Sequence, residues 1–227
     1  MLKAGVALSA GLAAAAPVMA RTNTSEQELK LRLARLEDEQ MIRALHRTYD
    51  NLLDSGSYQQ VAGLFTDNAE VIFNGGVYQG KNRGIRRLYH DHFSAGMSGR
   101  KIGPPAGFEP DAELHRDVVE VAQDGKTATA RFSYSIELGA PMQGDSVLVK
   151  MARLHGEGIR KYWEGGHYAI NCVKDVVDDS WKITRLEHQV LARAEIRPGQ
   201  SRAKPVAIAP FSKVYPQDPT GPDKLVC

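Results

Sequence analysis

The sequence predicts an α+β fold in which three N-terminal helices pack against a cone-shaped, strongly bent and mostly antiparallel sheet. Apolar residues recur at helical spacing through much of residues 25–93, whereas alternating apolar and polar residues dominate residues 113–192. Turn formers such as Gln123-Asp124-Gly125 separate the later segments into hairpins. Helices first and strands afterwards are typical of α+β domains.

The first helix is expected to begin at Thr24 or Ser25 and to end at Asp54. Both starting residues are good N-caps, and acidic residues occupy the first turn. Apolar side chains then repeat every three or four residues until Asp54-Ser55-Gly56 ends the pattern. Two shorter helices are expected at Tyr58–Phe65 and Gly84–Phe93.

The first hairpin is expected around Asn74-Gly75-Gly76, where glycine supplies the positive φ of a tight turn. Turn formers between Ser94 and Asp111 predict a long loop that acts as a lid or contacts substrate. Residues 139–160 are interpreted as an insertion. The expected strands are Ala69–Phe73, Val77–Gln79, Glu113–Val121, Thr127–Leu138, Tyr162–Val176 and Trp181–Ala192.

The chain divides into four predicted segments. Residues 1–20 contain a lone cation, Lys3, then an apolar run and a small-residue pattern that ends at Ala20, as in a secretory signal peptide. A polar, helical extension (21–34), the α+β domain (35–195) and a proline-rich tail (196–227) follow. Cleavage after Ala20 predicts a periplasmic or secreted protein.

The composition limits the partners that the protein is expected to bind. The chain has 29 basic and 27 acidic residues and no basic stripe with interleaved aromatics, so no nucleic acid is expected. The N-terminal apolar run is shorter than the ~20 residues that span a bilayer, and no membrane is expected as a partner. The two cysteines, Cys172 and Cys227, do not make a disulfide framework, so stability must come from burial or from a homodimer.

Tyr49 and Asp54 place a hydroxyl and a carboxylate at the end of the first helix, where they are candidates for acid–base chemistry. Each has a plainer interpretation. In the plainer interpretation, Tyr49 is a core aromatic residue, because it lies on the apolar face of its helix. Asp54 is then simply part of the turn that ends the helix.

No metal and no cofactor is expected. The run His90-Asp91-His92 resembles a metal site, but residues two apart on a helix point to different sides. The sequence contains no phosphate-binding loop, dinucleotide fingerprint or nucleophile elbow.

Three stretches carry a resemblance to a known family: YDNLLDSGSYQQVAGLFTDNAEVIFNGGVYQGK, VVEVAQDGKTATARF and YWEGGHYAINCVKDVVDDSWKI. With the order of the segments, they resemble the SnoaL-like branch of the nuclear transport factor 2-like superfamily over roughly residues 35–192. The resemblance implies a cone-shaped α+β fold that is usually dimeric. It also implies an activity like those of the family's cofactor-free members, which are dehydratases, isomerases, cyclases and other lyases that act on polycyclic or aromatic substrates. The family also includes binding proteins without catalysis, so the fold alone does not define the function.

The same resemblance implies a set of catalytic residues. Tyr49 and Asp54 match a Tyr and an Asp that point into the cone in dehydratase-type members. His115 is the nearest match to the catalytic His before the DG turn, and as a general base it would pair with Asp54. His115 is also compatible with an ordinary structural role. Departure of a leaving group would also need an acid, and the candidates are Tyr49 and Glu137, which lies on the following strand.

Phe73, Trp163, His167 and Tyr168 are the candidate substrate-binding residues. Trp163 or Tyr168 would stack a flat substrate if it faced the cone, and simple core packing is the alternative. The overall prediction is a cofactor-independent lyase that dehydrates or deformylates a hydrophobic aromatic or steroid-like small molecule. The alternatives are a non-catalytic module for ligand binding or assembly, and an isomerase that uses the same base.

Overall fold

A computed structural model describes residues 18–96, 100–102, 117–142, 144–155, 158–196 and 204–226. The chain separates by its internal contacts into a unit that ends at Leu36 and a second unit, Glu37–Cys227. Helix α1 (Val18–Asp54) contributes to both units and begins before the predicted start. Residues 1–17, which hold most of the predicted signal peptide, lie outside the described residues. Among the described residues, no helix combines the length and the apolar character needed to cross a membrane.

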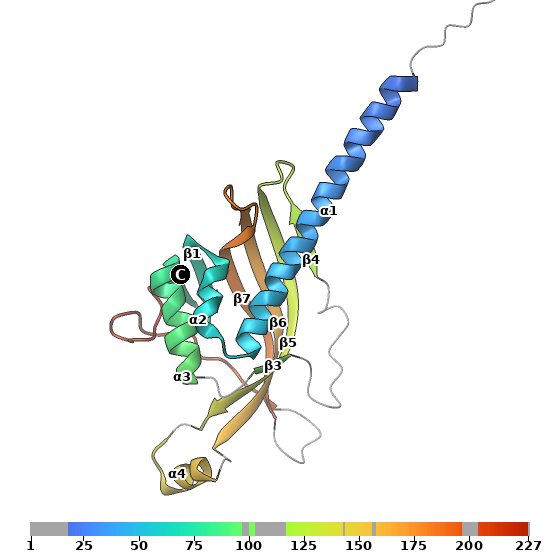
Figure 1. Ribbon diagram of the computed structural model, residues 1–227. Helices are drawn as coiled ribbons and strands as arrows, with labels where there is room; N and C mark the ends of the chain where they lie inside the picture. Colours follow the sequence, from blue (N-terminus) through green and yellow to red (C-terminus); the bar gives the residue numbers. More distant parts are fainter. Residues whose placement is uncertain are drawn as a thin grey trace, which may run out of the picture. The chain divides into compact units, whose positions relative to one another are not determined.

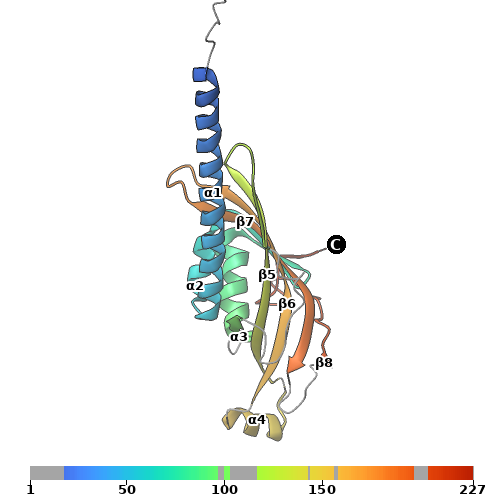
Figure 2. The same ribbon diagram turned by 90° about the vertical axis from the view of Figure 1, so that its right-hand side faces the viewer.

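One curved, mostly antiparallel sheet organises the second unit (Figures 1 and 2). The order of its strands is β3-β5-β6-β7-β1-β2-β9, with β4 paired to β5 and β8 paired to β7. β1 and β7 run parallel, while the other pairs run antiparallel. The strands are β1 (Phe65–Phe73), β2 (Gly76–Gln79), β3 (Arg100–Ile102), β4 (Val118–Val121), β5 (Thr127–Pro141), β6 (Ile159–Lys174), β7 (Trp181–Ile196), β8 (Lys204–Pro205) and β9 (Lys224–Leu225).

Three helical segments cover one face of this sheet, as Figure 2 shows. They are the end of α1, the short α2 (Tyr58–Val61) with the 3₁₀ turn η1 (Ala62–Leu64), and a continuous segment from 80 to 96. That last segment consists of two wide π-helical stretches, η2 (Gly80–Ile85) and η3 (Arg87–Phe93), followed by α3 (Ser94–Gly96). The predicted fold class, three helices on a bent and mostly antiparallel sheet, is confirmed.

Alternation along the strands explains which residues form the core. On β5 and β6, Phe132, Tyr168 and Ile170 face the helices and are buried. A polar contact also holds α1 to the sheet: the indole N–H of Trp181 donates to Asp38 at 3.0 Å, and the Lys174 ammonium lies 2.6 Å from the same carboxylate. Helix α1 stops at the predicted turn, where Gly56 adopts φ +69°.

Several element boundaries differ from the predictions. β1 begins at Phe65 and continues through Asp67 and Asn68, which are typical strand breakers, and a shift of its register against β7 accommodates them. The predicted loop from 94 to 111 contains strand β3. β5 and β6 extend into the predicted insertion, whose tip forms helix α4 (Val147–Leu154). Residues 103–116 lie outside the described ones.

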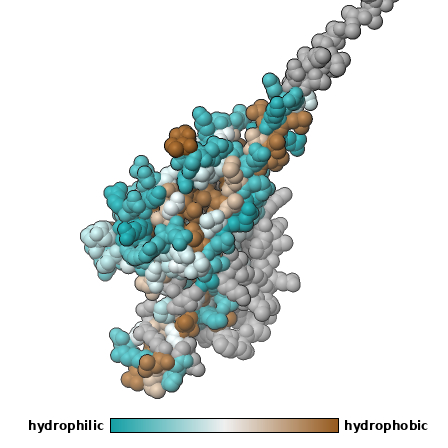
Figure 3. Space-filling view, viewed as in Figure 1, coloured by the Kyte–Doolittle hydropathy of each residue, from teal (hydrophilic) through white to brown (hydrophobic). Residues whose placement is uncertain are grey.

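Helix α4 carries apolar side chains that solvent reaches. Val147, Leu148 and Leu154 are exposed, and Figure 3 shows apolar and polar surface mixed at this tip of the molecule. The proline-rich tail, in contrast, packs on the domain. Residues 204–226 return to the sheet and pair with it through β8 and β9.

Candidate functional site

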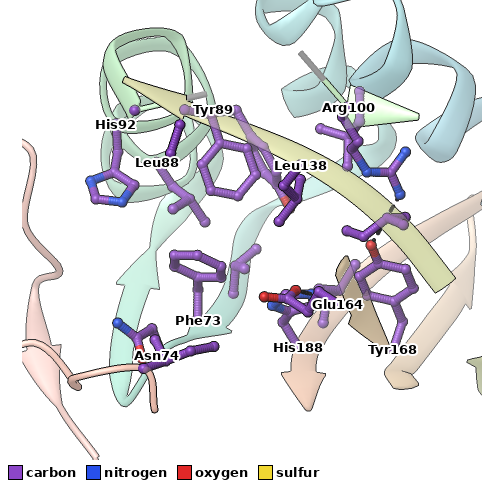
Figure 4. A pocket seen from close by; sticks show the side chains of 18 of the residues that line it. Phe73, Asn74, Leu88, Tyr89, His92, Arg100, Leu138, Glu164, Tyr168 and His188 are labelled. Atoms are coloured by element: carbon purple, nitrogen blue, oxygen red, sulfur yellow. Dashed lines mark hydrogen bonds and ion pairs between the residues drawn. The ribbon is translucent and has the colours of Figure 1, made fainter. Parts of the chain in front are cut away.

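A cavity of about 200 Å³ lies between the sheet and the helices that cover it. Figure 4 shows side chains from helix and sheet facing each other across it. The end of α1 and segment η3 supply Tyr49, Leu53, Leu88, Tyr89, His92 and Phe93; strands β1, β5, β6 and β7 supply Val71, Phe73, Ile136, Leu138, Glu164, Tyr168, Leu186, His188 and Arg193; Arg100 and Ile208 come from β3 and the C-terminal segment.

A row of ring side chains runs along the sheet side of this cavity. Phe73, His188, Tyr168 and Tyr134 lie on four adjacent strands, β1, β7, β6 and β5. The ring centroids of neighbours in this row are 5.3, 5.2 and 4.6 Å apart, with interplanar angles of 21°, 22° and 29°. The rings are therefore stacked on one another, and Phe73, His188 and Tyr168 of this row line the cavity.

Glu164 contributes a carboxylate to the cavity lining. It lies in strand β6 and is only 3% exposed, which is unusual for a charged residue. Its Oε1 lies 3.5 Å from Nε2 of His188 and accepts a hydrogen bond from the Tyr134 hydroxyl at 3.2 Å. Oε2 lies 3.8 Å from the Arg193 guanidinium. Burial raises the pKa of Glu164, while Arg193, the Tyr134 hydroxyl and Arg100 act in the opposite direction.

His188 is the imidazole of the same pair. Burial, helped by the positive charges of Arg100 and Arg193, lowers the pKa of His188 to about 3, so the ring is neutral at pH 7. A neutral imidazole that faces a carboxylate through Nε2 carries its proton there. The buried Nδ1 atom has no hydrogen-bond partner among the described residues. The Nδ1 lone pair of His188 is therefore not used in any hydrogen bond within the described part of the chain.

Arg100 forms a second polar cluster at the cavity wall. Its guanidinium pairs with Asp50 at 2.7 Å and with Asp54, and it donates to the Tyr168 hydroxyl at 3.2 Å. Because the Tyr168 oxygen accepts this bond, its own O–H is free to donate toward a ligand. Burial raises the pKa of Tyr168 well above its ordinary value although Arg100 opposes the shift, so this hydroxyl keeps its proton at neutral pH.

Two further tyrosines, Tyr49 and Tyr89, line the cavity from the helices. The oxygens of Tyr49 and Tyr89 lie 3.0 Å apart in a buried hydrogen bond. Both rings also contact other aromatic rings of the site, Tyr49 at 5.5 Å from Tyr168 and Tyr89 at 5.3 Å from Phe93. Burial raises the pKa of both hydroxyls, which act as neutral hydrogen-bonding groups.

The predicted site residues separate into two groups. Tyr49, Phe73 and Tyr168 line the cavity. Asp54 is bound by Arg100 behind the wall, and it is not among the residues that line the cavity. His115 lies outside the described residues, so its predicted pairing with Asp54 stays a prediction.

Three other candidates lie elsewhere in the sheet. Glu137 follows Ile136 and precedes Leu138, both of which line the cavity, so it points to the opposite face and pairs with Lys161 at 3.0 Å. Trp163 is buried with its indole N–H bonded to Ser135, and His167 is half-buried. Both alternate with the cavity-lining Glu164 and Tyr168 along β6 and therefore face away from the cavity.

Sequence reasoning missed Glu164, His188, Arg193, Arg100 and Tyr89. A signal for Glu164 was present in the strand period: if Tyr168 faces the cone, the residue four positions earlier faces it too. A signal for His188 lay in the last strand, where it follows buried Leu186 by two positions. Arg100 carried no signal, because it lies in a segment expected to be a loop.

Among the described residues, no group of three His, Cys, Asp or Glu side chains is arranged to bind a metal ion. His90 and His92 illustrate this. His90 contacts Gln59 and Asp91, while His92 lines the cavity and approaches Thr220.

Solved structures of other proteins have a similar fold. Hexachlorocyclohexane dehydrochlorinase (LinA) type 2 superimposes with a TM-score of 0.54 at 14% identity, covering 80% of this chain and 99% of that one. LinA type 3 from Novosphingobium barchaimii gives 0.51 at 15% identity over 80% and 99% of the two chains. A Novosphingobium aromaticivorans protein provisionally named scytalone dehydratase gives 0.52 at 16% identity over 78% and 97%.

At these identities the structural likeness concerns the fold. No curated protein matches the sequence significantly. The sequence itself matches the SnoaL-like domain family over residues 34–187, which include the cavity-lining parts of α1, η3, β1, β5 and β6 and the first residues of β7. The chain is therefore a member of the SnoaL-like domain family.

Proposed function

We propose that the protein is a cofactor-independent lyase that eliminates a small leaving group from a compact, hydrophobic ring compound. The observation that carries the proposal is the Glu164–His188 pair: a buried carboxylate 3.5 Å from a neutral imidazole, both lining one cavity. The names of structurally similar proteins, a dehydrochlorinase and a provisional dehydratase, support an elimination. Environments that push the pKa values of two adjacent groups away from their ordinary range are characteristic of acid–base sites.

His188 is the proposed base. Its Nδ1 lone pair accepts the proton of a substrate C–H bond, and the electrons of that bond form the new double bond as the leaving group departs. Glu164 holds the imidazole tautomer through Nε2 and stabilises the imidazolium that forms. The Tyr168 hydroxyl, bonded to Arg100, donates a hydrogen bond to the departing group. The proton then leaves His188 with that group, which returns the site to its initial state.

The cavity also limits the substrate. An apolar cavity of about 150 Å³ accommodates benzene, and the volume of this one is about 200 Å³. A molecule with one ring and small substituents fits, and it would contact Phe73, His188 and Tyr168, the rings of the row that line the cavity. This is smaller than the steroid-like substrates that the sequence left open. The predicted export and homodimer remain proposals.

The test is turnover of a panel of single-ring compounds, each with a hydroxyl or halide adjacent to an acidic C–H bond. The wild-type protein is expected to convert at least one compound after treatment with a chelator. His188→Phe and Glu164→Gln are expected to lower kcat/KM by about 10²–10⁴-fold. His90→Ala, outside the cavity, serves as the matched control and keeps the wild-type rate. Binding of ring compounds without any turnover would contradict the lyase and favour a ligand-binding module.

A further inference from the structure

The C-terminal strap, residues 204–226, crosses from one part of the sheet to another. Its first residues pair with β7 as strand β8, and its last residues pair with β2 as strand β9. The family match ends at residue 187, so the strap lies beyond the part of the chain that the SnoaL-like family describes. Figure 1 shows this segment returning to the same side of the molecule as α2 and α3.

A partly buried ion pair between Arg87 and Asp223 fixes the C-terminal end of the strap. The Arg87 guanidinium lies 2.7 Å from the Asp223 carboxylate and donates from Nε to the Gly221 carbonyl at 2.8 Å. The Tyr215 ring lies 4.4 Å below the same guanidinium. The backbone N–H of Gln79 donates to the other Asp223 oxygen at 2.7 Å.

Two glycines of the domain are shaped to receive the strap. A β-carbon at Gly76 would lie 2.6 Å from the ring of Pro222, and one at Gly84 would overlap the Asp223 carboxylate. These close approaches require the absence of a side chain at both positions. The strap is therefore an integral part of the fold.

Between its two ends the strap reaches the cavity. The Asn74 side chain donates to the Ala209 carbonyl at 2.8 Å, and the backbone N–H of Phe211 donates to the Asn74 carbonyl at 3.2 Å. The Phe211 ring lies 5.4 Å from His92. These contacts hold Ile208 in position as one of the residues that line the cavity.

We infer that Ile208 is a specificity-determining residue, and that the strap sets the upper size limit of the substrate at about one ring. The inference rests on the cavity being the substrate site of the proposed function. Ile208 is contributed by a segment outside the family's shared domain, and it lines the same cavity as Phe73, Asn74 and His92. Its branched side chain occupies space that a second ring would need, and replacing it changes the volume without touching Glu164 or His188.

The experiment compares binding of phenol and 2-naphthol by NMR titration, so it does not depend on turnover. The wild-type protein is expected to bind phenol in preference to 2-naphthol. Ile208→Ala should raise the affinity ratio of 2-naphthol to phenol at least tenfold, and Ile208→Phe should weaken phenol binding at least tenfold. Val206→Ala is the matched control, since Val206 lies on the strap, contributes its backbone N–H to β7 and does not line the cavity.

Equal ratios in Ile208→Ala and Val206→Ala would overturn the inference, as would failure of the folded wild-type protein and of Ile208→Ala to bind either compound. Circular dichroism establishes that each variant is folded. If the ratio changes as expected while no compound is converted, the lyase is wrong and the role of Ile208 stands.

Discussion

Nε2 of His188 and Oε1 of Glu164 lie 3.5 Å apart, on neighbouring strands β7 and β6, within a cavity of about 200 Å³. Strand pairing produces this relationship. Tyr168 on β6 is directly opposite His188 on β7. Residues two apart on a strand face the same side, so Tyr168, Gly166 and Glu164 all face the cavity side of β6. The register shift between Gly165 and Gly166 adjusts the two strands at this point.

Replacing Glu164 by Gln should lower activity while leaving the stability of the fold nearly unchanged. The amide can still accept the Tyr134 hydrogen bond, and it removes a buried charge whose pKa is raised by burial. The free energy of unfolding in urea at pH 7 is therefore expected to change by no more than ~1 kcal/mol. A loss of more than ~3 kcal/mol would indicate that this carboxylate is held for structure and would argue against its catalytic role.

His188 should make the folded state sensitive to acid. Its pKa is about 3 in the folded protein against an ordinary value of 6.5, so between these pH values the unfolded chain binds a proton that the folded chain does not. Stability is complete above pH 6.5 and falls as the pH drops through this window. In His188→Phe, the dependence of the unfolding free energy on pH should be shallower by up to ~1.4 kcal/mol per pH unit. Urea titrations at pH 7, 6, 5 and 4 measure it.

Glu164 acts with the opposite sign, because its raised pKa favours the folded state as the pH falls. It is present in both proteins, so the comparison isolates His188. Parallel stability curves for the wild-type protein and His188→Phe would mean that the imidazole binds the same number of protons in the folded and the unfolded chain, so that folding does not lower its pKa.

Arg100 should be the most sensitive cation of the domain. Its side chain is 2% exposed and joins Asp50, Asp54 and Tyr168. Arg100→Met leaves two carboxylates without their cation, and a loss of ~3–5 kcal/mol is expected from urea unfolding. The triple variant that also carries Asp50→Asn and Asp54→Asn should recover part of it. Arg131→Met, at an exposed position of β5, should change stability by ~0.5 kcal/mol or less.

Gly166 is predicted to tolerate no side chain. A β-carbon there would overlap the Gln189 carbonyl and lie 2.8 Å from the Tyr134 hydroxyl, so Gly166→Ala should displace the ring that bonds Glu164. A loss of ~1–3 kcal/mol is expected. At Gly63 an added β-carbon would meet nothing within 4 Å, so Gly63→Ala is the matched control. Equal thermal unfolding midpoints for the two variants would contradict this packing.

The fold could be predicted because its signals are local. Asn74 and Gly75 have positive φ values in the expected hairpin turn, and α1 ends at the expected Gly56 turn. The predicted ends of helices and strands were less accurate where contacts between distant segments determine where an element begins or ends. β3 forms in a segment rich in Gly and Pro because Arg100, Lys101 and Ile102 pair with β5.

The site was only partly predictable, since its polar residues are stabilised by partners distant in sequence. Tyr49 and Tyr168 follow apolar periodicity and were identified as candidates. The buried carboxylate of Glu164 is stabilised by Tyr134, His188 and Arg193. These residues lie on different strands, and the sequence alone does not give the register that brings them together. Glu137 was chosen from the right strand, but the period of the strand turns it to the other face.

A crystal structure of the protein with a bound single-ring ligand is the sharpest test of the Glu164–His188 site. We expect the ring to lie in the cavity against Phe73, His188 and Tyr168, with a ligand atom within ~3.5 Å of Nδ1 of His188. A ligand that binds outside the cavity, or one separated from His188 by other side chains, would contradict the assignment of His188 as the base.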